Sequence, residues 1–270
     1  MILNLVVLML SAAGSVGVWL GAGISPWWLL LLLPAFYIGL LAVYFGTLWL
    51  VSLFFPKKGP KRSGAFCRRV IQLSLDWLLL LLRVKISLSG TELLPDCPCV
   101  LVSNHRSDFD PLAMLAVLRG RGLIYISKEE NFRLPLAGNY IRQAGFLAID
   151  RENGMKAMRT LKQAAGRLRD EGLDVGIYPE GTRSKTGELL DFKSGAFYLA
   201  KKADAPIAVM TTQGTERIGK NFPLHSTAVR LHICRIIDRE TVRASSLEEL
   251  SAIVRGIIEA DLSAADSERY

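Results

Sequence analysis

The sequence predicts an α/β fold, a mixed sheet flanked by helices, with an N-terminal hydrophobic helical membrane anchor. Short apolar runs typical of strands alternate with longer helical stretches over most of the chain. Residues 1–56 differ, because they contain no Lys, Arg, Asp or Glu, and residues 57–270 hold every charge. We therefore expect an anchor of two helices at 1–56, a basic juxtamembrane and amphipathic segment at 57–84, and one folded domain at 85–270.

The first segment contains two apolar stretches that are long enough to cross a bilayer. Residues 2–20 are about as long as the ~30 Å hydrocarbon core requires, and residues 27–55 are longer than required. Residues 21–26 are expected to form the turn between them, and Pro34 can kink the second helix. Tryptophans gather near this turn, as interfacial aromatic residues do: Trp19, Trp27 and Trp28.

Two alternatives to a spanning hairpin remain open. A signal peptide would place small residues such as 11–13 near a cleavage site, but a basic first region is missing and a second apolar segment follows. A hairpin that enters one leaflet and returns is the other alternative. Either hairpin leaves both of its ends on the same side of the membrane.

The segment after the second apolar stretch is strongly basic. Six basic residues follow directly, with no acidic residue among them: Lys57, Lys58, Lys61, Arg62, Arg68 and Arg69. Without these six, the chain carries 27 basic residues against 25 acidic ones, so the net charge of +8 belongs mostly to this segment. Basic flanks lie on the cytoplasmic side, and each such residue near anionic lipid contributes about 1 kcal/mol of attraction. We expect the folded domain on the cytoplasmic side, anionic lipids as partners and no nucleic acid.

The elements that follow are predicted from apolar runs and capping signals. Residues 66–84 lie along the membrane or pack beneath the domain. Strands are expected at residues 99–103, 123–126, 146–149, 175–178 and 230–234. Asn153 is predicted to cap a helix that reaches Arg169. Ser246 and Glu249 fit a capping box that opens a final helix ending at about Ala260.

The motif Asn104-His105-Arg106-Ser107-Asp108-Phe109-Asp110 offers a general base and its orienting carboxylate. On a continuous helix, His105 and Asp110 would lie roughly 140° apart, so the segment between them should be a turn. Pro111 favours Asp110 as the N-cap of a helix through about Leu118. The looped His105 can then donate one ring N–H to Asp110 and direct its other nitrogen at a hydroxyl. The alternative is a helix cap beside a polar loop histidine.

A second polar cluster follows the predicted strand at 175–178. The turn Pro179-Glu180-Gly181-Thr182-Arg183-Ser184 contains an acid, a glycine, two hydroxyls and an arginine. The planar guanidinium of Arg183 suits an anion, because it grips phosphate oxygens with two hydrogen bonds. The alternative is an ordinary loop with a solvated arginine.

Four blocks in this order resemble the glycerolipid acyltransferases that acylate lysophosphatidic acid, the 1-acylglycerol-3-phosphate O-acyltransferases. Residues 104–110 are similar to the family's Asn-His-x-Ser-x-x-Asp motif, and Lys128 opens a block that ends in Ile-Asp-Arg at 149–151. Residues 178–184 match the third block, with Tyr178 where the family usually has Phe. Residues 205–210 are a looser version of its Val-Pro-Ile-Val-Pro-Val strand and lack the second proline.

The resemblance implies an acyltransferase catalytic domain at residues 85–270. The implied reaction moves a fatty acyl group from acyl-CoA or acyl carrier protein to the sn-2 hydroxyl of 1-acylglycerol-3-phosphate, forming phosphatidic acid in phospholipid biosynthesis. His105 would accept the hydroxyl proton, and Asp110 would fix its tautomer and stabilise the imidazolium. Ser107 is the alternative, as a covalent nucleophile, although Gly-x-Ser-x-Gly is absent.

The resemblance also assigns an acceptor site. It agrees with the chemistry of the loop on Arg183 for the substrate phosphate, with Lys128 and Arg151 as helpers. The residues that would shape the same site are Glu180, Gly181, Thr182 and Ser184. The alternative for Lys128 is a solvated lysine at a strand end, and for Arg151 an ion pair with Asp150 or Glu152.

Three other functions remain open. The nearest is acyl transfer to a lysophospholipid with another headgroup, and a membrane-bound hydrolase would cleave a thioester or ester with water. A lipid-binding scaffold would need only the anchor and the basic flank.

No cofactor and no metal site are expected. The cysteines at 67, 97, 99 and 234 lack zinc spacing, and we interpret them as structural and reduced. His225 and His232 are interpreted as surface or strand residues, because neither has a carboxylate at a telling distance in the sequence.

Overall fold

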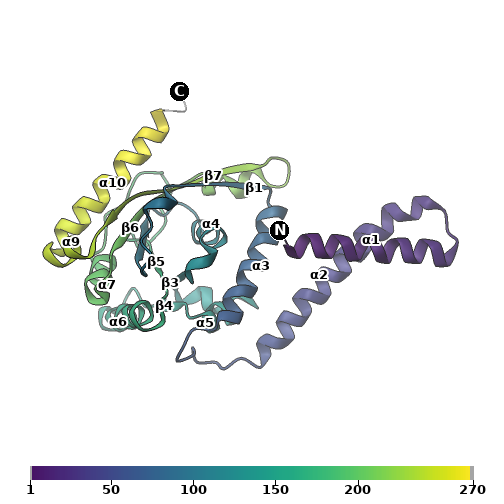
Figure 1. The fold of residues 1–270 in the computed structure, drawn as a ribbon, viewed down its shortest axis with the longest axis horizontal. Coiled ribbons are helices and arrows are strands. Elements are labelled where there is room, and N and C mark those ends of the chain that lie inside the picture. Colours follow the sequence, from purple (N-terminus) through teal and green to yellow (C-terminus); the bar gives the residue numbers. More distant parts are fainter. Residues whose placement is uncertain (1, 268–270) are drawn as a thin grey trace.

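The computed structural model describes residues 2–267 and contains a seven-stranded mixed sheet with helices on both faces (Figure 1). The strands are β1 (Val84–Ser89), β2 (Val100–Ser103), β3 (Ile124–Lys128), β4 (Leu147–Ile149), β5 (Val175–Ile177), β6 (Ile207–Gln213) and β7 (Thr227–Ile237). The α-helices are α1 (Ile2–Ala22), α2 (Leu29–Leu53), α3 (Ala65–Leu81), α4 (Asp110–Val117), α5 (Ala137–Ala144), α6 (Gly154–Glu171), α7 (Gly195–Ala203), α8 (Ile218–Asn221), α9 (Arg239–Ala244) and α10 (Leu247–Ser267). The predicted fold class is confirmed.

The strand order in the sheet is β1-β7-β6-β2-β5-β3-β4. The five strands from β6 to β4 run parallel, β7 is antiparallel to β6, and β1 is parallel to β7. Val102 of β2 lies between Ile177 of β5 and Val209 of β6. Because both faces of these central strands are covered, their sequences are continuous apolar runs rather than alternating ones.

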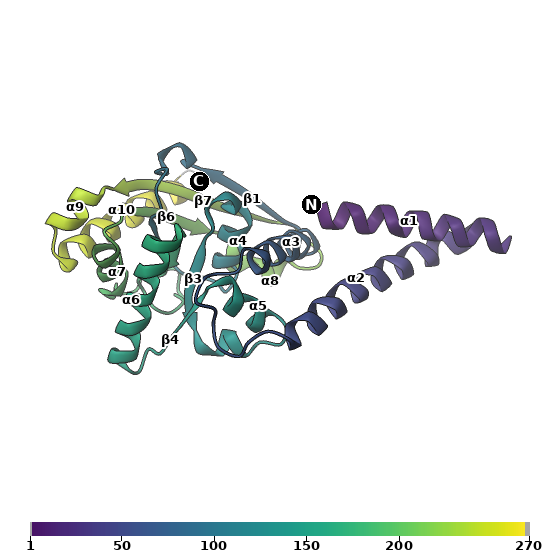
Figure 2. The ribbon, with the colours of Figure 1, turned by 60° about the horizontal axis from the view of Figure 1, so that its bottom comes forward.

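Two layers of helices cover the sheet. Helix α3 contacts both α4 and α5, and these three helices lie over one face, whereas α6, α7 and α10 cover the other (Figures 1 and 2). The core between the layers includes fully buried side chains such as Val100, Ile124, Phe197 and Ile207. This packing holds the ends of the parallel strands at fixed positions, and the loops that leave those ends carry the polar motifs.

The capping signals in the sequence locate two helices correctly. Asn153 caps α6, because its side chain accepts a hydrogen bond at 3.1 Å from the backbone N–H three residues later. Ser246 and Glu249 form the predicted capping box of α10 through reciprocal bonds of 2.7 and 3.1 Å. Helix α10 extends past the predicted end, because Leu262 and Ala265 continue its buried apolar face.

Strand β1 was not expected from the sequence. It begins where the predicted amphipathic segment was taken to end, and its apolar residues Val84, Ile86 and Leu88 alternate with polar ones. Alternation of this kind is the signature of a half-buried strand, and β1 is an edge strand paired with β7. The signal was therefore present in the sequence but is short.

Helices α1 and α2 form a hairpin that projects away from the sheet (Figure 2). Both are long and apolar enough to cross a membrane by length and composition. Helix α3 packs beneath the domain against α4 and α5, and it also contacts α1. Two hydrogen bonds in sequence join α3, α2 and α1. Trp77 of α3 donates to the Tyr37 hydroxyl of α2 at 3.0 Å, and Tyr37 donates to Asn4 of α1 at 2.5 Å. The division at residues 56 and 84 stays a prediction.

Candidate active site

The predicted site residues gather at one edge of the sheet. Strands β2, β5, β3 and β4 are parallel neighbours in this order, so their carboxyl ends lie side by side. His105 follows β2, Arg183 follows β5, Lys128 ends β3 and Arg151 follows β4. Crevices outside the carboxyl ends of parallel strands are the usual ligand sites of α/β sheets.

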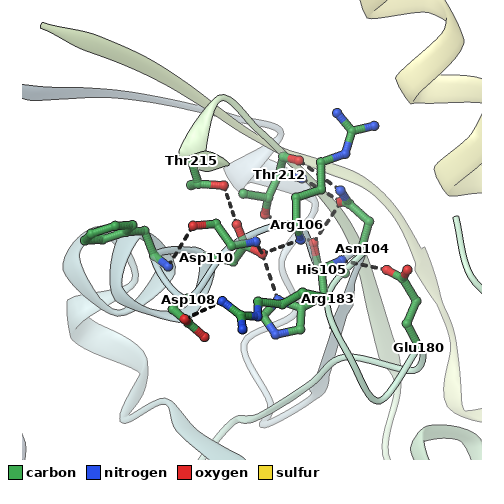
Figure 3. A network of polar contacts seen from close by, with 12 residues as sticks. Asn104, His105, Arg106, Asp108, Asp110, Glu180, Arg183, Thr212 and Thr215 are labelled. Carbon is green, nitrogen blue, oxygen red and sulfur yellow. Dashed lines mark hydrogen bonds and ion pairs between the residues drawn. The ribbon is translucent and has the colours of Figure 1, made fainter. Parts of the chain in front are cut away.

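His105 and Asp110 are directly hydrogen-bonded, as the sequence predicted (Figure 3). The distance from His105 Nδ1 to Asp110 Oδ2 is 2.8 Å. The same oxygen accepts the backbone N–H groups of Arg106 at 2.7 Å and Ser107 at 2.8 Å, and the Thr215 hydroxyl donates to Oδ1. An ionised carboxylate can only accept, so Nδ1 of His105 carries the proton and Nε2 is left as the acceptor.

Asp110 begins α4 as predicted, but it is not the N-cap. Phe109 occupies that position, and Asp110 is the first helical residue. Its carboxylate turns back to the preceding loop, where the amides of Arg106 and Ser107 converge with the His105 ring, instead of capping the helix that follows. The proposed cap role of Asp110 was therefore wrong, because the donors of this loop bind the carboxylate.

Glu180 holds the backbone of His105. Its Oε1 accepts the His105 N–H at 2.7 Å, and Oε2 accepts the Leu190 N–H at 3.0 Å. Burial raises the pKa of Glu180, although these two N–H donors oppose the shift. The Ser184 N–H also donates to the His105 carbonyl at 2.8 Å. The loop after β5 therefore holds His105 through both its backbone N–H and its backbone carbonyl group.

Two threonines belong to this network and were missed by sequence reasoning. Thr215 binds Asp110, and the backbone N–H of Thr212 donates to the Asn104 amide oxygen at 2.8 Å. The Asn104 amide group in turn donates to the Thr212 carbonyl at 2.9 Å. Thr212 lies on β6 and Thr215 follows Gly214, which has φ +92°. No spacing in the sequence relates these residues to the motif at 104–110.

Arg183 lies beside the His105 loop. Its side chain is 46 % exposed, and its guanidinium forms an ion pair with Asp108, which belongs to that loop (Figure 3). Lys128 is half-buried and Arg151 is exposed, and within residues 2–267 neither side chain forms a hydrogen bond or ion pair. The alternative pair between Arg151 and Asp150 is absent there, because Asp150 binds Lys156 instead at 3.1 Å.

The other predicted acceptor-site residues shape the loop itself. Gly181 has φ +68°, and its N–H donates to the Tyr178 carbonyl at 3.0 Å, which closes a tight turn. Thr182 is exposed at this turn. Ser184 is buried and accepts the Gly187 N–H at 3.1 Å, so its hydroxyl stabilises the loop.

A second histidine–aspartate pair lies between β7 and α10. His232 lies in β7, as the sequence predicted, and α10 brings Asp261, which is distant in the sequence, to 2.6 Å from its Nδ1. His232, Cys234 and Asp261 are close enough to meet around a metal ion. However, Arg230 binds both Asp261 oxygens and Thr211 donates to one of them. These side chains therefore bind one another in an ion-pair network that holds α10 against the sheet.

The comparison with protein families identifies the central part of the chain. Residues 85–213 match the family model described as Acyltransferase. This part of the chain is similar in sequence to acyltransferases. The acyltransferase segment runs from β1 to the end of β6 and contains every predicted site residue.

Named relatives are similar to part of the chain. The human 1-acyl-sn-glycerol-3-phosphate acyltransferase beta is 43% identical over 110 residues, which are 41% of this chain and 39% of the relative. The human alpha protein is 34% identical over 62% of this chain and 59% of its own length. The chloroplastic LPAT1 of Arabidopsis thaliana is 34% identical over 62% of this chain and 46% of the relative. The chain thus spans about half the length of the curated relatives it matches.

A solved structure shares the fold. The crystal structure of the 1-acyl-sn-glycerophosphate (LPA) acyltransferase PlsC from Thermotoga maritima superposes with a TM-score of 0.61. It covers 86% of this chain and 92% of the PlsC chain at 22% sequence identity. At this level of identity the match shows that the two chains share a fold.

Proposed function

We propose that this protein transfers a fatty acyl group from a thioester donor, acyl-CoA or acyl carrier protein, to the sn-2 hydroxyl of 1-acylglycerol-3-phosphate, giving phosphatidic acid. The observation that carries the proposal is the His105–Asp110 pair, with Nε2 of His105 left as an acceptor and the Arg183 guanidinium on the adjacent loop. The names of the relatives support the same acceptor.

The chemistry follows from the protonation state of the pair. Nε2 of His105 accepts the proton of the sn-2 hydroxyl as its oxygen bonds to the thioester carbonyl carbon. Asp110, hydrogen-bonded to Nδ1, stabilises the imidazolium that forms. The C–S bond then breaks, and the departing thiolate recovers the proton from His105. Ser107 is not needed as a nucleophile, and its hydroxyl instead accepts the Phe109 N–H at 3.2 Å.

Arg183 is proposed to bind the acceptor phosphate. Its ion pair with Asp108 supports this role, because a guanidinium that holds an exposed carboxylate can exchange it for a phosphate. Lys128 and Arg151 extend the positive charge along the same sheet edge. Glu180, which binds the His105 backbone, would then act by placing the base.

The membrane arrangement belongs to the same proposal. Residues 1–56 form the anchor, the basic residues of 57–84 contact anionic lipids, and the catalytic domain at 85–270 lies on the cytoplasmic side. An acceptor that resides in the bilayer would then reach the sheet edge without leaving its leaflet.

The test is acyl transfer by the purified full chain beside His105→Gln and the matched control His225→Gln. We expect phosphatidic acid from lysophosphatidic acid with acyl-CoA or acyl carrier protein, a loss of at least about 10²-fold in His105→Gln, and wild-type rates in the control. Free fatty acid formed equally without acceptor would instead indicate a hydrolase. No turnover with either donor, together with vesicle binding, would indicate the scaffold alternative.

The acceptor phosphate is tested separately with Arg183→Ala. We expect KM for lysophosphatidic acid to rise at least about 10-fold, while the folded variant keeps the thermal stability of the wild type. The loss of a bidentate phosphate contact predicts this selectivity. An unchanged KM in the folded variant would remove Arg183 from the site.

A further inference from the structure

Three aromatic rings are stacked from the core outward, and the outermost ring is the imidazole of His105. The His105 imidazole lies on the ring of Tyr178, with 4.1 Å between centroids and 12° between planes. Tyr178 lies in turn on Tyr125, at 5.7 Å and 11°. The rings are thus nearly parallel, and the outermost one is the proposed base.

The strands build this stack through a glycine. Tyr125 of β3 is in register with Gly176 of β5. A Cβ on Gly176 would lie 2.3 Å from Cε1 of Tyr125, so only glycine allows this ring to lie across β5. Tyr178 is two residues after Gly176, on the same face, and its ring therefore meets Tyr125.

The innermost ring of the stack, that of Tyr125, is hydrogen-bonded to α4. The Tyr125 hydroxyl donates to Sδ of Met114 at 2.9 Å, and Met114 is one helical turn after Asp110. One helix thus places the carboxylate that binds Nδ1 of His105 and supports the rings beneath the imidazole.

Tyr178 contributes through its ring and not through its hydroxyl. The hydroxyl is buried and, among the described residues, has no hydrogen-bond partner. Burial, and next to it the neighbouring Tyr125, raise the pKa of Tyr178 well above its usual value, so the phenol stays neutral. The part of Tyr178 that meets the catalytic histidine is the flat face of the ring.

We propose that Tyr178 is a positioning residue for His105: its ring holds the imidazole plane so that Nε2 faces the acceptor. The bond to Asp110 fixes only the position of Nδ1, and the imidazole can still pivot about that contact. A parallel ring at 4.1 Å removes this freedom, and its π face favours the imidazolium formed during transfer. The effect on turnover rests on the proposed function, whereas the effect on the imidazole itself does not.

The kinetic test compares Tyr178→Phe with Tyr178→Leu. Phenylalanine keeps the ring and removes only the unpartnered hydroxyl, so we expect wild-type kcat and KM. Leucine removes the ring, and we expect kcat to fall about 10- to 100-fold with the acceptor KM within about twofold, because orientation is lost and binding is kept. Equal kcat in a folded, active Tyr178→Leu variant would overturn the positioning role.

The stack is tested independently by NMR of histidine-labelled protein. The chain has three histidines, so His225 and His232 provide internal controls. We expect ring-current shifts of the His105 ring protons in the wild type and in Tyr178→Phe, and their loss in Tyr178→Leu, with the control signals unmoved. Unchanged His105 signals in Tyr178→Leu would overturn the proposal even if the protein transferred no acyl group.

A folding control accompanies both tests. Thermal unfolding selects variants that retain the native structure, and Tyr178→Met replaces Tyr178→Leu if leucine leaves the domain unfolded. Methionine is flexible enough to fill the space of the ring without providing a flat face. It is therefore expected to reproduce the kinetic and NMR effects of leucine.

Discussion

Asp110 is completely buried, and four donors converge on its carboxylate. Three of them meet at Oδ2, which explains why the loop from His105 to Ser107 folds around this side chain. A buried charge is tolerated only when it is paired and hydrogen-bonded in this way. Asp110 is thus part of the local fold as well as the orienter of His105.

Asp110→Asn is expected to lose both activity and stability, although asparagine caps helices as well as aspartate does. The asparagine amide group would place N–H donors against the N–H donors of the loop or leave them unpaired. We expect the free energy of unfolding to fall by about 3 kcal/mol and acyl transfer to fall at least about 10²-fold. Thermal unfolding and activity measure the two effects, and wild-type stability would contradict the buried network.

Asp108 is expected to compete with the substrate phosphate for Arg183. Both side chains are substantially exposed, so the ion pair itself contributes little to stability. Asp108→Asn should lower KM for lysophosphatidic acid about 3- to 10-fold at low salt, with kcat unchanged. The difference should shrink at high salt, because exposed charges are screened.

The matched control for this charge change is Asp191→Asn. Asp191 is fully exposed, and its ion pair with Arg255 is a long one, with 4.0 Å between the nearest atoms. A decrease in KM common to both variants would indicate a general effect of net charge. An increase in KM with Asp108→Asn alone would mean that Asp108 helps to bind the acceptor.

The residues of the site differ in how far the sequence predicts them. His105, Asp110 and Arg183 lie within two short motifs, so their types and spacing indicate their chemistry. Thr215 comes to Asp110 from the end of β6, more than a hundred residues later, and Glu180 binds a backbone amide. Such contacts depend on which strands are neighbours, and spacing along the chain carries no record of strand order.

At the scale of elements, the caps of α6 and α10 and the buried strands were predicted because their signals are local. The edge strand β1 was missed, and so was the docking of the segment before α3 onto α6. Ser63 donates to Glu171 from its backbone N–H at 2.7 Å and its hydroxyl at 2.6 Å. Arg167 donates to the carbonyls of Lys61 and Pro60. The basic segment is thus held against the domain by polar contacts.

Glu171→Gln is expected to loosen this segment in a pH-dependent way. Burial tends to raise the pKa of Glu171, but the Ser63 bonds and Arg167 outweigh it and leave the pKa below the usual 4.5. A lowered carboxyl pKa stabilises the folded state above about pH 4.5, and this stability is lost as the pH falls through the folded-state pKa.

Amide hydrogen exchange over residues 60–64 measures the loosening. At neutral pH we expect faster exchange in Glu171→Gln than in the wild type, and the difference should disappear under acid conditions. Glu259→Gln is the control, because Glu259 forms an exposed pair with Arg255 on α10. Equal exchange at neutral pH would show that Glu171 does not hold the segment.

At the scale of the whole molecule, the change in composition at residue 56 does not coincide with a gap in packing. The end of α2 and the residues after it contact the domain, because the Tyr140 hydroxyl donates to the Leu48 carbonyl at 3.1 Å and Gln143 donates to the Pro56 carbonyl at 2.8 Å. Leu48 belongs to the same buried cluster as the sheet. The absence of charge from residues 1–56 agrees with the proposed lipid contact and also with burial against α5, and composition does not separate the two.

Leu48→Ala and Leu50→Ala separate these two environments on one helix. Leu48 is 8% exposed and Leu50 is 54% exposed, although they are two residues apart. We expect Leu48→Ala to lower the free energy of unfolding by about 2–3 kcal/mol, because it opens a cavity between α2 and the domain. Leu50→Ala should change it by less than about 0.5 kcal/mol, because its side chain lies outside the core.

The measurement is thermal unfolding of the full chain in one detergent, with acyl transfer as a second readout. For a domain of this size, 2–3 kcal/mol corresponds to a decrease in Tm of about 4–12 °C. Equal Tm values for the two variants would mean that α2 moves independently of the domain, and the boundary at residue 56 would then be a true hinge. A selective loss in Leu48→Ala would instead mean that the end of α2 is part of the catalytic domain, so the anchor fixes the orientation of the sheet edge toward the bilayer.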